Sequence, residues 1–469
     1  MITLDATLTT LGPLSIGTGV VDANSDRPVV CDQHGRPVIP GTSLAGALRA
    51  AAVRRYGPSV AARLFGPASA GADDLRRRSP VIVSDAPFAG EDFELPPVML
   101  RQHVAIDRER LAAQDELKFD AETWPLKLPF RLRLDTPDDE LAYLQGVLDE
   151  VEGPAGGLGA GACRIEVRNR RVSRPGDLDR VLRAAMQRYH DPHVTVPREE
   201  DDPPPDAAEG VDAGRVAVVL QLRLSTVLPL ACREPKDPFS SDRDNDPFTV
   251  VVRHDDGSYR RQPGIPGTSL RGVLRQRAER ALAAAGVDPF DPPQNPVLAT
   301  FGTAGDDDGG GRAGAVIVED ALAADIEWQL ETVDASQDGC IERPRVKLDR
   351  LTHSPLGGAF FDDTLVADGV ELEARITIAP PDREVTDRDV ALVAIGLRDI
   401  AAGAAGVGGS TRAGYGTLEV KGGTVTSYQR TARGLETEQT TLQPDAGTVG
   451  WDTAWSERIR AAWKEFTHG

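Results

Sequence analysis

Apolar and polar residues alternate along two segments of the chain, residues 2–8 (ITLDATL) and residues 216–222 (VAVVLQL). A period of two is typical of a β-strand with one buried face. Each segment leads into a hairpin and then into a run of helical periodicity, and a second helical run is predicted at about 138–151 and 387–402. A glycine-rich turn and one more strand follow each second helix. The pattern therefore predicts a β-α-β-β-α-β order, present twice.

The hexapeptide Ile-Pro-Gly-Thr-Ser-Leu also occurs twice, at residues 39–44 and 265–270. Proline fixes its own φ, and glycine permits a backbone that other residues disfavour. A Thr/Ser pair before an apolar-periodic run is an N-cap signal. Both copies therefore predict the end of a strand or turn that leads into a helix, with Thr42 and Ser43, or Thr268 and Ser269, at the helix start.

The repeat extends beyond the hexapeptide, because three further motifs recur in the same order with small changes of spacing. They are a Phe-Gly pair at 65–66 and 301–302, a strand ending in Asp-Ala at 81–86 and 316–321, and an Asp-Arg pair at 107–108 and 349–350. Colinear motifs of this kind indicate a duplicated domain.

We therefore expect an α+β fold built from two tandem ferredoxin-like domains with hairpin and loop insertions. The expected boundaries are a first domain at 1–190, an acidic proline-rich linker at 191–214, a second domain at 215–425, and a C-terminal tail at 426–469. In this tail, Trp451, Trp455 and Trp463 have a spacing that suits one face of a short docking helix.

Composition narrows the choice of partners. The formal net charge is −20, with 73 acidic against 53 basic residues, and such a balance argues at face value against nucleic acid. The segment from Gln33 to Gly66, however, contains no acidic residue, and the helix after each hexapeptide is basic. We therefore predict contacts to an anionic ligand near each helix N-terminus. The predicted residues are the two Thr/Ser pairs and three helical arginines: Thr42, Ser43, Thr268, Ser269, Arg49, Arg271 and Arg275.

Two observations bear on the cellular compartment. The four cysteines are far apart and form no CxxC pair, so we expect reduced thiols and no zinc site. No stretch approaches the roughly 20 apolar residues of a membrane span, and the N-terminus lacks the pattern of a signal peptide. A cytoplasmic protein is expected.

Together these motifs resemble the RAMP superfamily of CRISPR-associated proteins, and most closely the repeated backbone subunit of type III effector complexes. The resemblance implies modified RRM domains that line up along a guide RNA. It also implies complementary target RNA and further effector subunits as partners: a large polymerase/nuclease subunit, a small subunit and other RAMP subunits.

Within the resemblance, residues 408–416 are similar to the family's glycine-rich loop with its arginine, which implies RNA contacts by Gly409, Ser410, Arg412 and Gly414. The corresponding turn of the first half lacks an arginine before its glycines. Arg108 and Arg350 lie where the family places a loop that intrudes between guide and target bases, which implies that these two arginines bind RNA phosphate. A plain salt bridge with the preceding aspartate is the alternative for each.

An acidic hairpin precedes each hexapeptide and ends in an aspartate beside a proline-containing strand. By resemblance, Asp26 and Asp246 match the family's cleavage residue. RNA can be cut when its own 2′-hydroxyl attacks the adjacent phosphate, and a carboxylate can accept the proton or hold a metal. Cleavage would therefore imply Mg²⁺ or another divalent metal at Asp26 and Asp246. Both aspartates can equally be turn residues.

The sequence thus indicates a guide-binding backbone subunit that cleaves target RNA. A non-catalytic guide-binding scaffold is the main alternative. A repeat-RNA processing endonuclease is a third possibility, and Tyr415 is its one candidate general base beside the glycine loop.

Overall fold

A computed structural model covers the chain. It describes residues 1–21, 25–66, 79–91, 94–107, 112–158, 163–174, 214–234, 246–288, 295–303, 311–330, 337–431 and 434–468. Residues 191–213 of the predicted linker lie outside the described ranges.

The first unit is built on a four-stranded antiparallel sheet with the order β3-β7-β1-β8. Its strands are β1 (Ile2–Thr10), β3 (Ile82–Val83), β7 (Pro129–Thr136) and β8 (Ile165–Ser173). Buried and half-buried residues alternate along β1, as the sequence pattern predicted. The buried residues of this sheet form one core with α1 (Gly41–Phe65) and α2 (Leu141–Val151). A single 3₁₀ turn (Asp138–Glu140) precedes α2.

Smaller elements complete the first unit. Two short strands pair with each other, β2 (Val38–Ile39) and β4 (Ala86–Pro87). A long hairpin is formed by β5 (Met99–Asp107) and β6 (Ala112–Thr123).

The second unit repeats this plan in a larger sheet, with the order β12-β13-β15-β18-β9-β19-β20 and β14 also paired with β18. The strands are β9 (Gly214–Thr226), β12 (Thr249–Arg253), β13 (Tyr259–Ile265), β14 (Val316–Val318), β15 (Ala321–Ala323), β18 (Glu371–Ile378), β19 (Leu418–Thr431) and β20 (Gly434–Leu442). The helices are α4 (Gly267–Ala284), α5 (Pro296–Phe301), α6 (Asp387–Ala401) and α7 (Thr453–His468), with a 3₁₀ turn at Thr411–Ala413. Two strand pairs lie apart from the sheet, β10 (Arg233–Glu234) with β11 (Asp246–Pro247), and β16 (Cys340–Leu348) with β17 (Pro355–Val366).

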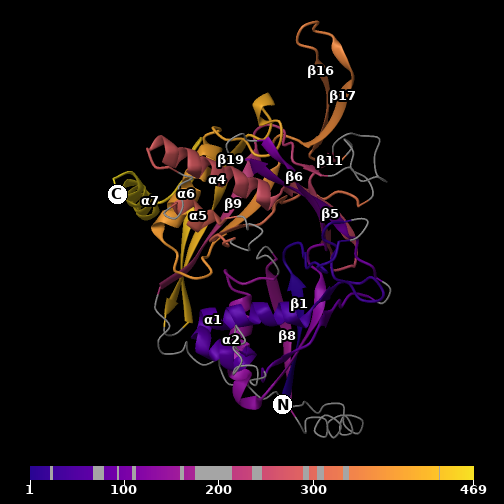
Figure 1. The fold of residues 1–469 in the computed structure, drawn as a ribbon, viewed down its shortest axis with the longest axis vertical. Coiled ribbons are helices and arrows are strands. Elements are labelled where there is room, and N and C mark those ends of the chain that lie inside the picture. Colours follow the sequence, from indigo (N-terminus) through magenta and orange to yellow (C-terminus); the bar gives the residue numbers. More distant parts are fainter. Residues whose placement is uncertain are drawn as a thin grey trace.

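The central four strands have the same succession in both units. The first strand of each unit lies between the strand that precedes α2 or α6 and the strand that follows that helix, giving β3-β7-β1-β8 and β14-β18-β9-β19. Figure 1 shows the two units stacked along the long axis, with α1 and α2 on the first and α4, α5 and α6 on the second. The predicted mixed α+β class is confirmed.

The C-terminal region is more ordered than its polar sequence suggested. Residues 426–442, which we assigned to the tail, complete β19 and add β20 at the edge of the sheet. The alternation was missed because β20 is an edge strand with few apolar residues. Of the three tryptophans expected on one helix, Trp455 and Trp463 lie on α7, whereas Trp451 precedes its first residue. Trp455 is buried in the core of the second unit.

All four cysteines are free, in agreement with the sequence. In the part of the chain that the structure describes, no helix is both long enough and apolar enough to cross a bilayer.

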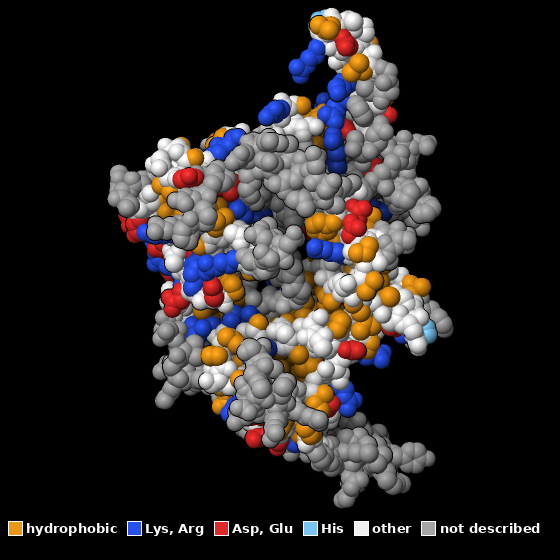
Figure 2. Space-filling model, in the orientation of Figure 1, with side chains coloured by type: hydrophobic (Ala, Val, Ile, Leu, Met, Phe, Trp, Pro, Cys, Tyr) orange, Lys and Arg blue, Asp and Glu red, His pale blue; other side chains and the backbone are white. Residues whose placement is uncertain are grey.

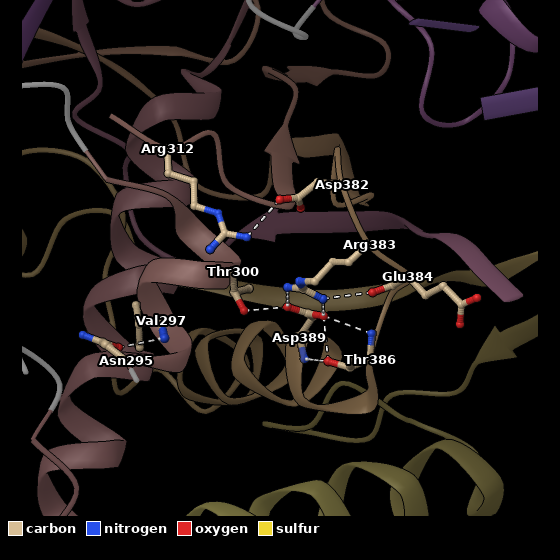
Figure 3. A network of polar contacts seen from close by, with 9 residues as sticks. All are labelled: Asn295, Val297, Thr300, Arg312, Asp382, Arg383, Glu384, Thr386 and Asp389. Carbon is tan, nitrogen blue, oxygen red and sulfur yellow. Dashed lines mark hydrogen bonds and ion pairs between the residues drawn. The ribbon is translucent and has the colours of Figure 1, made fainter. Parts of the chain in front are cut away.

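A buried carboxylate holds the start of α6 (Figure 3). Asp389 and Thr386 form a capping box, in which each side chain binds the backbone N–H of the other. Arg383 donates to both oxygens of Asp389 at 2.7 and 2.6 Å, and Thr300 of α5 donates at 2.7 Å. Burial raises the pKa of Asp389, but the hydrogen bonds from Arg383, Thr300 and Thr386 outweigh it, so the net pKa is lowered.

This network predicts a pH-dependent contribution to stability. Because the folded pKa of Asp389 lies below its ordinary value of 3.8, the contribution is fully present above that pH and is lost as the pH falls below it. At neutral pH, Asp389→Ala should lower the free energy of unfolding by about 3 kcal/mol, since it leaves Arg383 without its buried partner. Denaturant unfolding measures the change.

The matched control is Asp382→Ala. Asp382 forms an exposed ion pair with Arg312 at 3.1 Å, and exposed pairs contribute little. Equal losses in the two variants would contradict the role assigned to the buried network.

Candidate nucleic-acid interface

The repeated motifs of the sequence meet at the start of the helix in each unit. The N–H of Gly41 donates to Oδ1 of Asp85 at 2.7 Å, and the N–H of Gly267 donates to Oδ1 of Asp320 at 2.8 Å. The N-cap residues are the prolines of the two hexapeptides, and no cap residue side chain accepts a hydrogen bond. The N-cap role expected of the Thr/Ser pairs is therefore wrong, because a distant aspartate accepts the first helical N–H.

The Thr/Ser residues instead occupy the first turn of each helix. Thr42 and Thr268 are exposed, while Ser43 and Ser269 are half-buried. A phosphate at either helix start would approach Asp85 or Asp320, whose negative charge opposes its binding.

Glycine is required at the start of the helix by a close approach of two backbones. A Cβ atom on Gly41 would lie 2.5 Å from the carbonyl oxygen of Val83, and one on Gly267 would lie 2.1 Å from that of Val318. Strand pairing holds the same two segments together, as Ile39 pairs with Ala86 in the first unit. The Pro-Gly and Asp-Ala motifs are thus two halves of one structural device.

The helical arginines also bind within the protein. Arg49 and Arg275 occupy equivalent positions, and they donate to the carbonyl oxygens of Gly66 and Gly302, the glycines of the repeated Phe-Gly pair. Arg271 donates to the carbonyl oxygens of residues 301 and 316. These three arginines anchor each helix to the next segment of its own unit.

Arg275 departs most from the expectation of an exposed phosphate contact. Its side chain is buried, and its Nε forms an ion pair with Glu279 at 2.9 Å. Arg49 and Arg271 are half-buried. The sequence showed an acid-poor helix but gave no sign that carbonyl groups would bind its arginines.

The glycine-rich loop of the second unit presents an exposed arginine. Ser410 and Gly414 have φ angles of 55° and 93°, in the left-handed region. Gly409 donates its N–H to the carbonyl of Ala231 at 2.8 Å, which fixes the loop beside the segment after β9. The residues from Thr411 to Gly414 are exposed, so Arg412 lies at the surface.

A basic cluster surrounds this loop where the hairpin β16–β17 begins. Asp363 is fully buried and pairs with both Arg233, at 3.2 Å, and Arg345. Arg345 also donates to Oγ of Ser410 at 3.2 Å and lies over the ring of Tyr415. Sequence reasoning missed Arg233 and Arg345, since neither belongs to a repeated motif.

The hairpin β16–β17 carries a basic stripe from this cluster outward. Arg343 and Arg345 share one face of β16, because side chains alternate along a strand. Lys347 follows them at a shift of the strand register. Figure 1 shows the hairpin projecting from the body, and Figure 2 shows Lys/Arg side chains along it. Arg350 is exposed in the turn at its tip.

Asp349 and Arg350 do not form the salt bridge with each other that we considered as an alternative. Asp349 accepts hydrogen bonds from the N–H groups of Leu351 and Thr352, and these bonds lower its pKa. It therefore shapes the turn and leaves Arg350 exposed. Arg108 lies outside the described residues.

Asp26 lies at the side of the equivalent hairpin of the first unit. Its side chain is exposed, and Oδ2 accepts the backbone N–H of Asp120 at 2.9 Å. The guanidinium of Arg27 lies 4.2 Å from the ring centroid of Phe119, which stacks on His103 at 4.9 Å. Burial and the charges of nearby arginines lower the pKa of His103, so its imidazole is neutral at pH 7.

Asp246 does not occupy the position of Asp26. Leu14 of the first unit and Leu230 of the second form equivalent β-bridges, so these two residues correspond to each other. Gly17 and Arg233, each three residues later, therefore also correspond. They lie opposite Val29 and Pro247. This register aligns Asp246 with Pro28, and it aligns Asp26 with Asp244, which lies outside the described residues.

The burial of Asp246 agrees with this register. Asp246 has 9% of its surface exposed, and its backbone lies opposite that of Glu234 in the pair of short strands β10 and β11. Asp26 and Asp246, which we matched by their neighbouring prolines, therefore do not occupy equivalent positions in the two units.

Asp26 could bind a metal ion only together with ligands from a second molecule. Among the described residues, no group of three or more His, Cys, Asp or Glu side chains could hold an ion. Mg²⁺ usually binds one or two carboxylates together with substrate phosphates. Asp26 can provide one such carboxylate, with RNA phosphate supplying further oxygens.

Comparison with known proteins identifies a family for the chain. A family model described as "RAMP superfamily" matches residues 7–164 and 250–419, more than half of the chain. The first stretch runs from β1 to the end of the first unit's glycine turn, and the second from β12 into β19. A comparison with curated proteins found no match.

The arginine anchors predict a loss of stability. Arg275→Ala should lower the free energy of unfolding by about 2 to 3 kcal/mol, because it leaves Glu279 and the carbonyl of Gly302 without their buried donor. Arg280→Ala, at an exposed position of the same helix, is the matched control and should have little effect. An unchanged unfolding midpoint for Arg275→Ala would show that this arginine is not an anchor.

Proposed function

The chain belongs to the RAMP superfamily, and we propose that it is a two-unit backbone subunit of a type III CRISPR effector complex. It binds guide RNA and assembles with further RAMP subunits, the large polymerase/nuclease subunit and the small subunit. The observation that carries this proposal is the basic cluster around the glycine-rich loop on a duplicated RAMP scaffold.

We infer that both units are ferredoxin-like, modified RRM domains. The β-α-β-β-α-β order supports this, as does the shared succession of their four central strands. Two such units in one chain place two potential RNA contacts in a fixed relation.

Guide binding is assigned to the second unit's loop and hairpin. Arg412 is exposed on a loop of fixed shape, and Arg345 is held at the root of the basic stripe by Asp363. Guanidinium groups suit an RNA backbone, because each can donate hydrogen bonds to phosphate oxygens. The helix starts are secondary candidates, since Asp85 and Asp320 already accept their first N–H.

Target cleavage is assigned to Asp26. Its exposed carboxylate can accept the proton of a 2′-hydroxyl as the 2′-oxygen bonds to phosphorus, and the neighbouring Arg27 can bind the phosphate on which negative charge develops. The bond from phosphorus to the 5′-oxygen breaks, which leaves a 2′,3′-cyclic phosphate, and the 5′-oxygen takes a proton from water. Phe119 orients Arg27 through the contact with its ring. Bound Mg²⁺ would supply further charge neutralisation at that phosphate.

A guide-binding scaffold without cleavage is the second candidate. It is favoured by the burial of Asp246, which leaves a single accessible aspartate of the predicted pair. RNA processing with Tyr415 as general base is supported only by the position of this residue beside the glycine-rich loop.

The binding proposal predicts a change in salt dependence. Arg412→Ala should weaken guide RNA binding and reduce the slope of log K against log salt by about 0.7 to 0.9, the value of one phosphate contact. Arg460→Ala, at an exposed position of α7, is the control and should leave the slope unchanged. Equal slopes for Arg412→Ala and wild type would remove the loop from the RNA contact.

The cleavage proposal predicts unequal effects of the two aspartates. With complementary target RNA, Asp26→Asn should abolish one cut and Asp246→Asn should leave the product ladder unchanged, provided that the variant folds as wild type by circular dichroism. Guide binding should survive in both. Chelation of divalent metal, or a 2′-deoxyribose at the cut position, should also block that cut. A wild-type ladder from Asp26→Asn would leave the scaffold function.

A further inference from the structure

The segment that carries Asp26 is held by the backbone of β6. The N–H of Asp120 donates to Oδ2 of Asp26 at 2.9 Å, and the N–H of Arg27 donates to the carbonyl oxygen of Asp120 at 3.1 Å. The carbonyl oxygen of Arg27 in turn accepts the N–H of Glu122 at 3.1 Å. The position of Asp26 and Arg27 therefore follows that of β6.

Ala121 of β6 connects this segment to β5. Ala121 forms a β-bridge with Arg27 on one side and pairs with Arg101 of β5 on the other. Side chains of residues directly opposite each other in neighbouring strands lie on the same face. Arg27, Ala121 and Arg101 thus form one row across three strands, with the buried Ala121 in the middle.

The row ends on the second unit. Arg101 forms an ion pair of 2.6 Å with Oδ2 of Asp320, and its guanidinium lies 5.1 Å from the ring centroid of Phe248. The side chains of Arg101 and Asp320 are only 18% and 10% exposed, so the pair is shielded from solvent. The other oxygen of Asp320 accepts the N–H of Gly267. Arg101 is therefore bound to a point that the start of α4 already fixes.

A backbone contact holds the end of β6 against the same unit. Three residues after β6, the N–H of Leu126 donates to the carbonyl oxygen of Val251 at 2.9 Å, and the N–H of Arg253 donates to that of Leu126 at 3.1 Å. The Leu126 side chain packs in the core of the second unit. The second unit thus holds β6 at its end and, through Arg101, beside Asp26.

The ion pair with Asp320 also distributes the charge along the row. Burial lowers the pKa of His103, the charges of Arg101 and Arg27 lower it further, and Asp320 opposes them, so these groups lie within electrostatic reach of one another. Asp320 neutralises Arg101, whereas Arg27 is exposed and forms no ion pair with another described residue. Arg27 is therefore the cation of this row that can bind a phosphate.

We propose that Arg101 is a positioning residue for the cut assigned to Asp26, so that the second unit completes the cleavage site of the first. By binding Asp320, Arg101 fixes the row that carries Arg27 and the strand that holds Asp26. Arg101 itself contacts no RNA, because its side chain is largely buried against the second unit. The inference rests on the proposed cleavage by Asp26 and adds a requirement for the other unit.

The test uses the assembled complex with its guide RNA and a complementary target RNA. The rate constant of the cut at saturating complex is measured separately from the dissociation constant of the target. Arg101→Gln should reduce the rate constant about tenfold or more and keep target affinity within about twofold, because a small displacement of reacting groups slows chemistry without removing a contact to RNA.

Two further variants test whether Arg101 acts through Asp320. Asp320→Asn keeps an oxygen for the N–H of Gly267 but removes the charge that Arg101 binds, so it should slow the cut to a similar extent. The double variant should be no slower than the slower single variant, since both changes remove the same interaction. Arg101→Lys, which keeps the charge without the planar fork, should restore part of the rate.

Arg164→Gln is the matched control. Arg164 pairs with Glu319 of the second unit at 2.6 Å, but it lies just before β8, outside the row that carries Arg27. This variant loses an ion pair between the same two units and should cut at the wild-type rate. Circular dichroism establishes that each variant is folded, and Asp320→Asn gives the same comparison if Arg101→Gln does not assemble.

Three results would overturn the inference. They are a wild-type rate constant in Arg101→Gln, an equal loss of rate in Arg164→Gln, or a weaker target affinity with a smaller salt slope in Arg101→Gln. The last would assign Arg101 to RNA. A wild-type ladder from Asp26→Asn would contradict the proposed cleavage and this inference with it, so failure of the inference alone is distinguishable from failure of the function.

Discussion

The bond between an aspartate and the first N–H of a helix fixes the plan of each unit. Asp85 reaches Gly41, and Asp320 reaches Gly267, across a backbone contact too close for any Cβ atom. That contact sets the helix against the strands that precede and follow it, and an arginine about two turns later binds the carbonyl of the glycine in the Phe-Gly pair. In the second unit the same aspartate also receives Arg101 of the first, so one carboxylate supports both the unit and the junction. The repeated motifs are therefore chiefly structural, and the RNA contacts are assigned to residues around them.

Much of the fold could be predicted from the sequence because its signals are local. The alternation of β1, the proline and glycine before each long helix, and the colinear repeats identified two α+β units. The edge strand β20 was missed, since a strand with one neighbour and an exposed face shows little apolar pattern. The caps were misassigned for a different reason: Asp85 is distant in sequence from Gly41, and the Thr/Ser pair beside that glycine matched the local rule.

The candidate site was less predictable, because its residues come together only through the fold. Arg412 follows from the glycine-rich loop, but Arg345 and Arg233 gain their place through the buried Asp363, whose register in a hairpin no motif encodes. For Asp246, in contrast, a local motif was present but suggested the wrong equivalence. Its neighbouring proline suggested equivalence with Asp26, whereas strand pairing aligns it with Pro28 and buries it. The two units are thus alike in their scaffold and unlike in their chemistry, since His103 stands in the first where Arg345 stands in the second.

Ultraviolet crosslinking of co-purified RNA, followed by peptide mass spectrometry, tests directly whether the second unit's loop and hairpin hold the guide RNA. If they do, a discrete RNA species should be crosslinked to peptides containing residues 408–416 and the strand β16. Crosslinks concentrated on α1 and α4, or protein that purifies without RNA, would contradict it.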